Sequence, residues 1–232
     1  MPGVQLVGLT KHYRRGSEII KALDGVTLDI DKGEFVAVVG RSGSGKTTLL
    51  DLLGLLLKPT AGRLIIDDVE TTRLSDRERA HMRAHKVGFV FQEYNLLSGL
   101  NVLENVMLPL RYVKNGSAGK QHAIELIDRV GLSDRIKHRP AELSGGQMQR
   151  VAIARSMVNG PSLILLDEPT GAVDTETAQQ LVDLLKRLNR EDRVTIVVVT
   201  HDTDIAAQAK RQIRLKDGNV LSDERIEQPA LA

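Results

Sequence analysis

The sequence contains no cysteine and no tryptophan, and it has only three tyrosines and three phenylalanines. Without cysteine, a disulfide framework, thiol catalysis and thiolate metal sites are excluded. No apolar run approaches the roughly 18 residues of a bilayer-spanning helix, so the chain is not expected to cross a membrane by itself. The first residues, Met1–Val4, lack a basic segment followed by an apolar one, and no secretory signal is expected. A cytoplasmic location is the default expectation.

The chain also has little net charge. Its 32 Lys and Arg residues against 30 Asp and Glu residues leave a formal charge of +2 over 232 residues. This balance predicts no strong attraction to nucleic acid or to an anionic lipid surface. Hydrophobic residues make up 41% and charged residues 27% of the chain, which is typical of a globular protein and argues against a disordered or coiled-coil chain. The length allows one large domain or two small ones.

Short runs rich in Val, Ile and Leu alternate with amphipathic stretches of helical length. One such stretch, Lys46–Leu57, predicts a helix. Strands that are apolar throughout and separated by helices are typical of a parallel sheet covered on both faces, so the expected fold class is α/β. The predicted strands are Phe35–Val39, Val87–Phe91, Leu163–Leu166 and Val194–Val199.

Other segments depart from this alternation. Antiparallel strands are predicted before Gly33 and over Arg63–Val69, and a hairpin turn is predicted at Lys216–Asn219, with arms Ile213–Leu215 and Val220–Leu221. Residues 92–158 are predicted to be mostly helical, with loops at 115–119 and 138–142. We therefore expect an α/β core with an antiparallel β subdomain, formed by residues 1–91 and 159–232, and an inserted helical subdomain at 92–158.

A glycine-rich segment after the first predicted strand matches the phosphate-loop pattern at every fixed position, and a helix follows it. Its backbone amides and the helix dipole would hold phosphate oxygens. Lys46 would supply a cation for the β- and γ-phosphates, and the Thr47 hydroxyl would ligate Mg²⁺. The pattern predicts nucleotide binding in a P-loop NTPase (RecA-like) core. The candidate residues are Gly40, Ser42, Gly43, Ser44, Gly45, Lys46, Thr47 and Thr48.

Two adjacent carboxylates, Asp167 and Glu168, end a predicted buried strand. A phosphate-loop protein needs an acid at a neighbouring strand end to hold Mg²⁺, and Asp167 fits that role. Glu168 points differently and would polarise the attacking water as a general base.

A second anion-binding segment precedes a predicted helix over Met148–Val158. It consists of Ser144, Gly145, Gly146 and Gln147, and its hydroxyl and glycine amides lie at the start of that helix. One nucleotide has only one γ-phosphate, so two anion-binding loops in one chain need an explanation. Together the motifs resemble the ATP-binding subunits of ABC transporters, and the resemblance covers nearly the whole chain.

The resemblance implies ATP and Mg²⁺ as ligands and a head-to-tail homodimer that sandwiches two ATP molecules. The segment Ser144–Gln147 of one copy would then act on the nucleotide of the other. Gln92 resembles the glutamine that touches Mg²⁺ or water, and His201 resembles the histidine that contacts the γ-phosphate. Asp174 belongs to a segment that resembles the loop through which the two sites communicate. Tyr13 would stack on adenine.

Within the family, several segments between Leu74 and Leu110 resemble the macrolide-exporter, lipoprotein-release and cell-division (MacB/LolD/FtsE-like) group. This resemblance implies a motor subunit for a separate membrane permease, which would dock beside Gln92 at Leu96–Leu110. The expected role is export or extrusion of lipoprotein, peptide or drug from the membrane, and the expected place is the cytoplasmic face of the plasma (inner) membrane. Two alternatives stay open: a mechanotransmitting ATPase that transports nothing, and a soluble ABC ATPase of the iron–sulfur assembly type.

Overall fold

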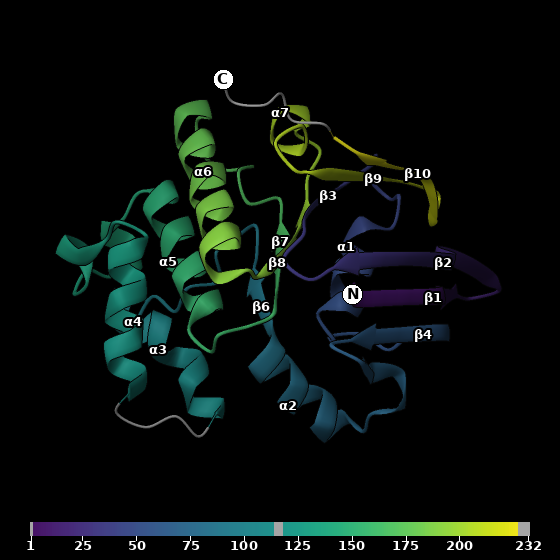
Figure 1. The fold of residues 1–232 in the computed structure, drawn as a ribbon, viewed down its shortest axis with the longest axis horizontal. Coiled ribbons are helices and arrows are strands. Elements are labelled where there is room, and N and C mark those ends of the chain that lie inside the picture. The colour runs from purple at the N-terminus through teal and green to yellow at the C-terminus, as the bar shows by residue number, and fades with distance from the viewer. Residues whose placement is uncertain (1, 114–117, 227–232) are drawn as a thin grey trace.

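The computed structural model describes residues 2–113 and 118–226. The larger of its two sheets has the strand order β10–β9–β3–β8–β7–β6 (Figure 1). Strands β9, β3, β8, β7 and β6 run parallel, and β10 pairs antiparallel with β9 at one edge. The predicted α/β fold with a parallel sheet is therefore confirmed. The strands of this sheet are β3 Phe35–Val39, β6 Val87–Val90, β7 Leu163–Asp167, β8 Thr195–Val199, β9 Arg211–Lys216 and β10 Asn219–Arg225.

The second sheet is antiparallel and has the order β2–β1–β4–β5. It contains the strands predicted before Gly33 and over Arg63–Val69. Its strands are β1 Pro2–Arg15, β2 Glu18–Asp31, β4 Ala61–Ile66 and β5 Val69–Glu70.

Helices cover the larger sheet and fill the predicted helical insertion. In Figure 1, α3, α4, α5 and α6 lie on one side of the central strands, and β1, β2 and β4 lie on the other. The helices are α1 Lys46–Leu53, α2 Asp76–Lys86, α3 Val102–Met107, α4 Ala118–Arg129, α5 Gly145–Met157, α6 Thr175–Asp192 and α7 Thr203–Ala206. Short 3₁₀ turns lie at Thr71–Arg73, Leu108–Tyr112, Ser133–Arg135 and Pro140–Glu142.

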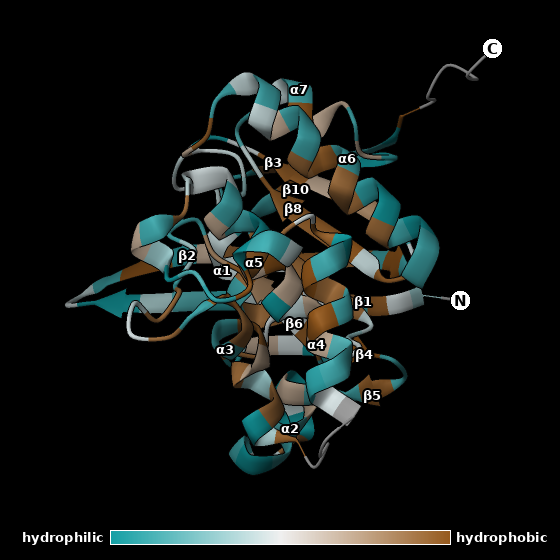
Figure 2. Cartoon of the chain, turned by 90° about the vertical axis from the view of Figure 1, so that its left-hand side faces the viewer, coloured by the Kyte–Doolittle hydropathy of each residue, from teal (hydrophilic) through white to brown (hydrophobic). Residues whose placement is uncertain are grey.

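The central strands are apolar at every position because both of their faces are buried. In β3, Phe35 and Ala37 belong to the core shared with α3 to α6. The alternate residues Val36 and Val38 belong to the core shared with α1 and the antiparallel sheet. Figure 2 shows the same division, with brown along β3 and β8 and teal on the outward surfaces of α4 and α6. Side chains alternate across a strand, so only a strand covered on both faces lacks a polar face.

Helix α1 ends at Leu53, four residues earlier than the predicted Leu57. Gly54 caps the helix, and Leu55 has a φ of 57°, which is incompatible with a continuing helix. The guanidinium of Arg79 donates to the carbonyls of Leu55 and Leu57 over 2.8 and 2.6 Å, so α2 satisfies the released backbone groups. The prediction was too long because an apolar run does not reveal a tertiary partner for its carbonyls.

Helix α5 begins at Gly145, three residues before the predicted start at Met148. Ser144 accepts a hydrogen bond from the amide of Gln147 over 3.3 Å, and Gln147 accepts one from the amide of Ser144 over 2.9 Å. This reciprocal capping box offsets the low helix propensity of the two glycines.

Two loop predictions also need correction. In the predicted loop 115–119, residues 115–117 lie outside the described residues, whereas Ala118 and Gly119 begin α4. In the predicted loop 138–142, Pro140–Glu142 form a 3₁₀ turn.

The predicted hairpin is confirmed, with Asp217 and Gly218 at its turn, both at positive φ. Its first arm, β9, also pairs parallel with β3 and so extends the main sheet, which the sequence did not reveal.

Candidate functional site

The phosphate loop lies at the carboxyl end of β3 and leads directly into α1. It borders a cleft of about 670 Å³ whose walls include Tyr13, Gln92, Asp167, Glu168 and His201. These residues are up to 188 positions apart in the sequence. The parallel sheet brings Gln92, Glu168 and His201 together because β6, β7 and β8 end at one edge, and Tyr13 reaches the cleft from β1 of the antiparallel sheet.

The loop backbone requires glycine at Gly45, which caps α1 with a φ of 102°. A Cβ atom built there would lie 2.2 Å from the carbonyl oxygen of Ala22, on β2. Gly43 also has a positive φ, of 79°, and a Cβ atom there would meet nothing within 4 Å. The loop therefore packs tightly against β2 at Gly45. It is open at Gly43, which lines the cleft where a phosphate would bind.

Lys46 is engaged with the loop itself. Its Nζ donates to the carbonyls of Gly40 and Arg41 over 2.7 and 3.0 Å. The buried Ser44 hydroxyl has no hydrogen-bond partner among the described residues. A polar group buried without a partner is costly, and a phosphate oxygen in the loop would offer an acceptor. Thus the loop fits the phosphate group that its sequence predicted.

Asp167 is the last residue of β7, and its carboxyl lies in the cleft near Lys46. Burial raises the pKa of Asp167, the nearby carboxylates of Glu168 and Asp51 raise it further, and Lys46 lowers it. A divalent cation would offset this crowding of negative charge.

Asp51 is a neighbour of this site that the sequence reading missed. It lies on α1, half-buried, and burial raises its pKa. Its position one helical turn after Thr47 was the available signal, since residues four apart share a helix face.

Glu168 and His201 form a pair across the ends of β7 and β8. His201 Nδ1 lies 2.9 Å from Glu168 Oε1, and the His201 amide donates to Oε2 over 3.3 Å. The hydrogen bond and charge of Glu168 raise the pKa of His201. Glu168 has a φ of 44°, in the left-handed region that non-glycine residues rarely adopt. Such strained residues gather at functional sites.

Gln92 and Tyr13 enter the cleft from different sheets. Gln92 follows β6, and a Cβ atom built on Gly171, just past Glu168, would lie 3.6 Å from Gln92 Nε2. Tyr13 lies on β1 and is 38% exposed, so part of its side chain is open to solvent. The ammonium of Lys11 lies 5.2 Å from the centre of that ring.

The predicted Ser144–Gln147 segment and Asp174 lie outside this cleft. Asp174 caps α6, accepting from the amide and hydroxyl of Thr177 over 2.9 and 2.8 Å. A Cβ atom built on Gly146 would lie 2.4 Å from Thr177 Cγ2, so the starts of α5 and α6 pack closely. The fold thus divides the predicted site residues into two groups, one in the cleft and one at these helix ends.

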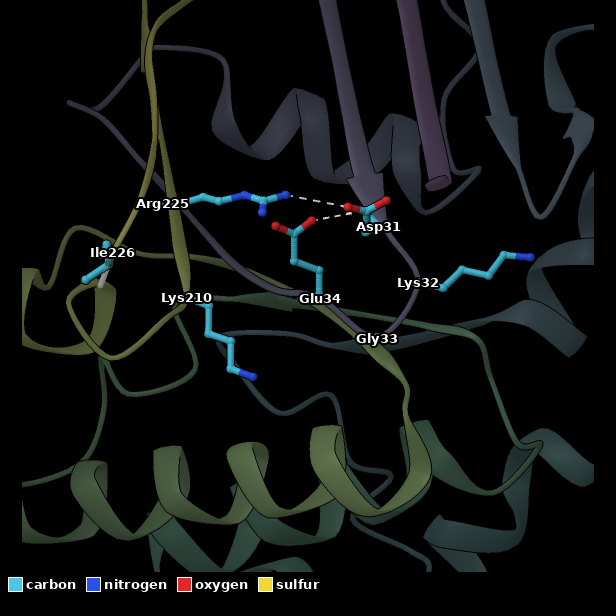
Figure 3. A pocket seen from close by; sticks show the side chains of 7 residues that line it. All are labelled: Asp31, Lys32, Gly33, Glu34, Lys210, Arg225 and Ile226. Carbon is cyan, nitrogen blue, oxygen red and sulfur yellow. Dashed lines mark hydrogen bonds and ion pairs between the residues drawn. The ribbon is translucent and has the colours of Figure 1, made fainter. Parts of the chain in front are cut away.

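A charged hollow of about 490 Å³ lies elsewhere and shares no lining residue with the cleft. Figure 3 shows Arg225 reaching Asp31, with Glu34 beside them. Nearby, Arg211 donates to both carboxylate oxygens of Asp223 over 2.6 Å and to Glu34 over 3.1 Å. Arg211 also donates to the carbonyl of Asp29 on β2 over 2.8 Å, so this cluster joins the two sheets.

An apolar groove of about 600 Å³ lies beside the segment that follows Gln92. Phe91, Leu108, Pro109 and Tyr112 contribute to its walls, and Arg83 and Arg155 supply positive charge. No acidic side chain lines it among the described residues. Most of the predicted docking segment, Leu96–Leu110, does not face this groove, because Val102 and Val106 are buried in the core.

Comparison with known proteins places these features in one family. The model of the ABC transporter family matches residues 23–171. An uncharacterized ABC transporter ATP-binding protein of Methanocaldococcus jannaschii, MJ0796, is 48% identical over 228 residues, covering 96% of this chain and 97% of that relative. The macrolide export ATP-binding/permease protein MacB of Rhodopirellula baltica is 47% identical over 225 residues. This chain spans 33% of the length of that relative.

Solved structures agree with this assignment. A dimeric post-hydrolysis state of the ATP-binding cassette MJ0796, bound to ADP and Pi, matches with a TM-score of 0.88 and 46% identity, covering 97% of this chain and all of that one. The cbiO1 protein of Clostridium perfringens, part of an ABC transporter complex, matches with a TM-score of 0.87 at 28% identity, covering 97% and 89%.

Within residues 2–113 and 118–226, every helix is too short or too polar to span a bilayer. The resemblance inferred from the phosphate loop and the Ser-Gly-Gly-Gln segment is confirmed by the family match and by relatives of similar length. The chain belongs to the ABC transporter family, as an ATPase of the ATP-binding-cassette type.

Proposed function

We propose that the chain is the motor subunit of an ABC transporter, in which ATP closes a homodimer and hydrolysis reopens it. The observation that carries this proposal is the division of the site residues. The cleft contains Lys46, Glu168 and His201, whereas Ser144 lies outside it. The first-turn amides of Gly145 and Gly146 have no acceptor within their own helix. A second copy would complete each site.

The proposed dimer has two equivalent ATP molecules between its copies. In each site the phosphate loop of one copy holds the triphosphate, and Tyr13 of that copy stacks on adenine. Ser144 and the glycine amides at the start of α5 of the other copy bind the γ-phosphate. Asp174 lies beside α5 and would transmit changes between the two sites. The dimeric structures of the MJ0796 cassette support this arrangement.

Three residues would hold Mg²⁺: Thr47, Gln92 and Asp167. The carboxylates in this part of the cleft fit a divalent cation, because the pKa of Asp167 is raised by burial and by neighbouring negative charge. When bound, Mg²⁺ would neutralise charge on the phosphate oxygens.

Hydrolysis would proceed by attack of water on the γ-phosphorus. Glu168 accepts a proton from the water as the new phosphorus–oxygen bond forms, and the bond to the β-phosphate oxygen breaks. The products are ADP and inorganic phosphate. Lys46 would leave the loop carbonyls to meet the phosphates, and His201 would contact the γ-phosphate.

The partner of this motor would be a membrane permease bound at the apolar groove. The groove offers apolar walls with two arginines and no acid, so an apolar helix carrying a carboxylate fits it by charge. The MacB relatives are ATP-binding/permease proteins, and this chain matches about a third of them. Docking would place the chain at the cytoplasmic face of the membrane and couple it to export.

We also propose that residues 92–158 form a separate helical subdomain, inserted in the sequence between the two parts of the core, 1–91 and 159–232. Strand β6 ends at Val90, and the next strand, β7, begins at Leu163, so no strand of either sheet lies between the two boundaries among the described residues.

The test is a Glu168→Gln variant, which should bind ATP and fail to hydrolyse it. With saturating ATP and Mg²⁺ the variant is expected to elute as a dimer in size-exclusion chromatography, and with ADP as a monomer. Glu224→Gln, which changes an exposed carboxylate on β10, is the matched control and should hydrolyse ATP normally. A Glu168→Gln variant that stays monomeric with saturating ATP would rule out the ATP sandwich.

A further inference from the structure

The loop after Gln92 has an unusual backbone. Tyr94 and Asn95 follow each other in the left-handed region, with φ values of 59° and 48°. Asparagine tolerates this region, whereas tyrosine rarely adopts it. The Tyr94 amide donates to Phe91, and the Asn95 amide donates to Glu93. The conformation costs more at Tyr94 than at Asn95, and the pair persists only where its surroundings hold it.

The side chain that holds this loop is Arg155, near the end of α5. Its Nη1 donates to the Asn95 carbonyl over 2.5 Å, and its Nη2 donates to the Tyr94 carbonyl over 2.7 Å. Burial lowers the pKa of Arg155, and no acidic group among the described residues offsets this effect. A guanidinium suits this position because its planar fork reaches two acceptors at once.

The same helix carries Ser144 at its other end. Arg155 follows Ser144 by 11 positions, which is about 16 Å along a helix. A Cβ atom built on Gly145 would lie 3.0 Å from the Tyr94 hydroxyl. The Tyr94 carbonyl therefore accepts a hydrogen bond from Arg155, and the Tyr94 hydroxyl packs against the start of α5.

We propose that Arg155 is a positioning residue for ATP hydrolysis. It holds the left-handed backbone of Tyr94 and Asn95 and so fixes the position of Gln92 relative to helix α5. Gln92, in the cleft of one copy, and Ser144, which acts on the nucleotide of the opposite copy, then move together. This role deepens the proposed function and rests on it for the use of Gln92. Arg155 and Asn95 also line the apolar groove, so a partner there would contact the same pair.

The test replaces the Arg155 guanidinium and then relieves the conformational cost of the left-handed backbone at Asn95. Arg155→Lys keeps the charge but loses the planar fork. Asn95→Gly allows a left-handed φ without a steric cost, so the loop needs less holding. The double variant combines both changes. The matched control is Arg150→Lys on the same helix, whose guanidinium donates to Val130 and Gln180 and does not touch the loop.

For Arg155→Lys, we expect kcat to fall about tenfold, the factor for losing one charge-assisted hydrogen bond, with KM for ATP little changed. Hydrogen exchange of a peptide spanning 92–97 should accelerate without nucleotide. Once Arg155 no longer holds the two carbonyls, the loop opens, and the amides of Tyr94 and Asn95 lose their hydrogen bonds within it. Asn95→Gly should recover most of the lost kcat in the Arg155→Lys background. Arg150→Lys should change neither measurement.

Unchanged exchange at 92–97 in Arg155→Lys would overturn the proposal, as would a fall in kcat that Asn95→Gly does not rescue. A purely structural defect in α5 would lower the midpoint of unfolding in urea, and Asn95→Gly would not restore kcat. The exchange measurement needs no hydrolysis, so it tests the hold on the loop even if the wild-type chain proves inactive. That last outcome would count against the proposed function instead.

Discussion

His201 Nδ1 lies 2.9 Å from Glu168 Oε1, so the proposed general base and the proposed γ-phosphate contact are hydrogen-bonded to each other. The Glu168 side chain is 16% exposed and the His201 side chain 75% exposed. The exposed imidazole therefore occupies one oxygen of a largely buried carboxylate. Release of this hydrogen bond would free both groups for the nucleotide.

The first prediction concerns the titration of this pair. The hydrogen bond and charge of Glu168 raise the pKa of His201 above its usual 6.5. Glu168→Gln should therefore lower the pKa of His201, as measured by NMR titration of its ring protons. Because the folded-state pKa is raised, the pair stabilises the fold fully below pH 6.5 and loses this effect as pH rises through the folded pKa of His201.

Asp202→Asn is the control for this titration. Asp202 also raises the pKa of His201, but less than Glu168 does. The asparagine variant should lower the pKa of His201 by a smaller amount. Equal shifts in the two variants would contradict the dominance of the Glu168 hydrogen bond.

The second prediction separates the structural role of Ser144 as a helix cap from its proposed role at the nucleotide. Ser75 caps α2 in the way that Ser144 caps α5, each accepting from the third helical amide over 3.3 Å. Ser75→Ala and Ser144→Ala should each lower the free energy of unfolding by about 1 kcal/mol, as measured in urea. Only Ser144→Ala should reduce kcat, on the order of a hundredfold, because it removes the proposed donor to the γ-phosphate of the other copy.

Equal ATPase activity in these two serine variants would show that Ser144 is only a helix cap. A large loss of stability confined to Ser144→Ala would also weaken the comparison, since both boxes have the two reciprocal bonds and the Ser75 hydroxyl makes one more, to Glu78 over 2.6 Å.

The third prediction concerns Arg211, which joins the two sheets. Its side chain and that of Glu34 are each 11% exposed. Arg211→Met should lower the free energy of unfolding by about 3 kcal/mol, because the largely buried Glu34 carboxylate loses its cationic partner and keeps only the Asp31 amide among the described residues. Arg214→Met, at an exposed position of the same strand, should cost less than about 0.5 kcal/mol. Urea unfolding of both variants makes the comparison, and equal costs would mean that the Arg211 cluster adds no stability.

The local motifs were readable from the sequence because their chemistry is local. The phosphate loop needs Gly45 at a positive φ and Lys46 at a helix start, and both follow from a short pattern. The buried strands were predictable from runs such as Phe35–Val39, since only a strand covered on both faces lacks a polar side. The end of α1 was not predictable, because Arg79 on another helix accommodates the carbonyls after Leu53.

By itself the sequence determined the fold class and, through its motifs, the family, since apolar periodicity and motif spacing act over a few residues. It also predicted the residues of the nucleotide site. Only the tertiary structure decided which groups meet. Glu168 and His201 are 33 positions apart, and they pair because β7 and β8 are parallel neighbours that end together. The structure likewise separated Ser144 from Lys46 and brought Arg155 to the loop after Gln92, because such contacts depend on how helices pack on the sheet.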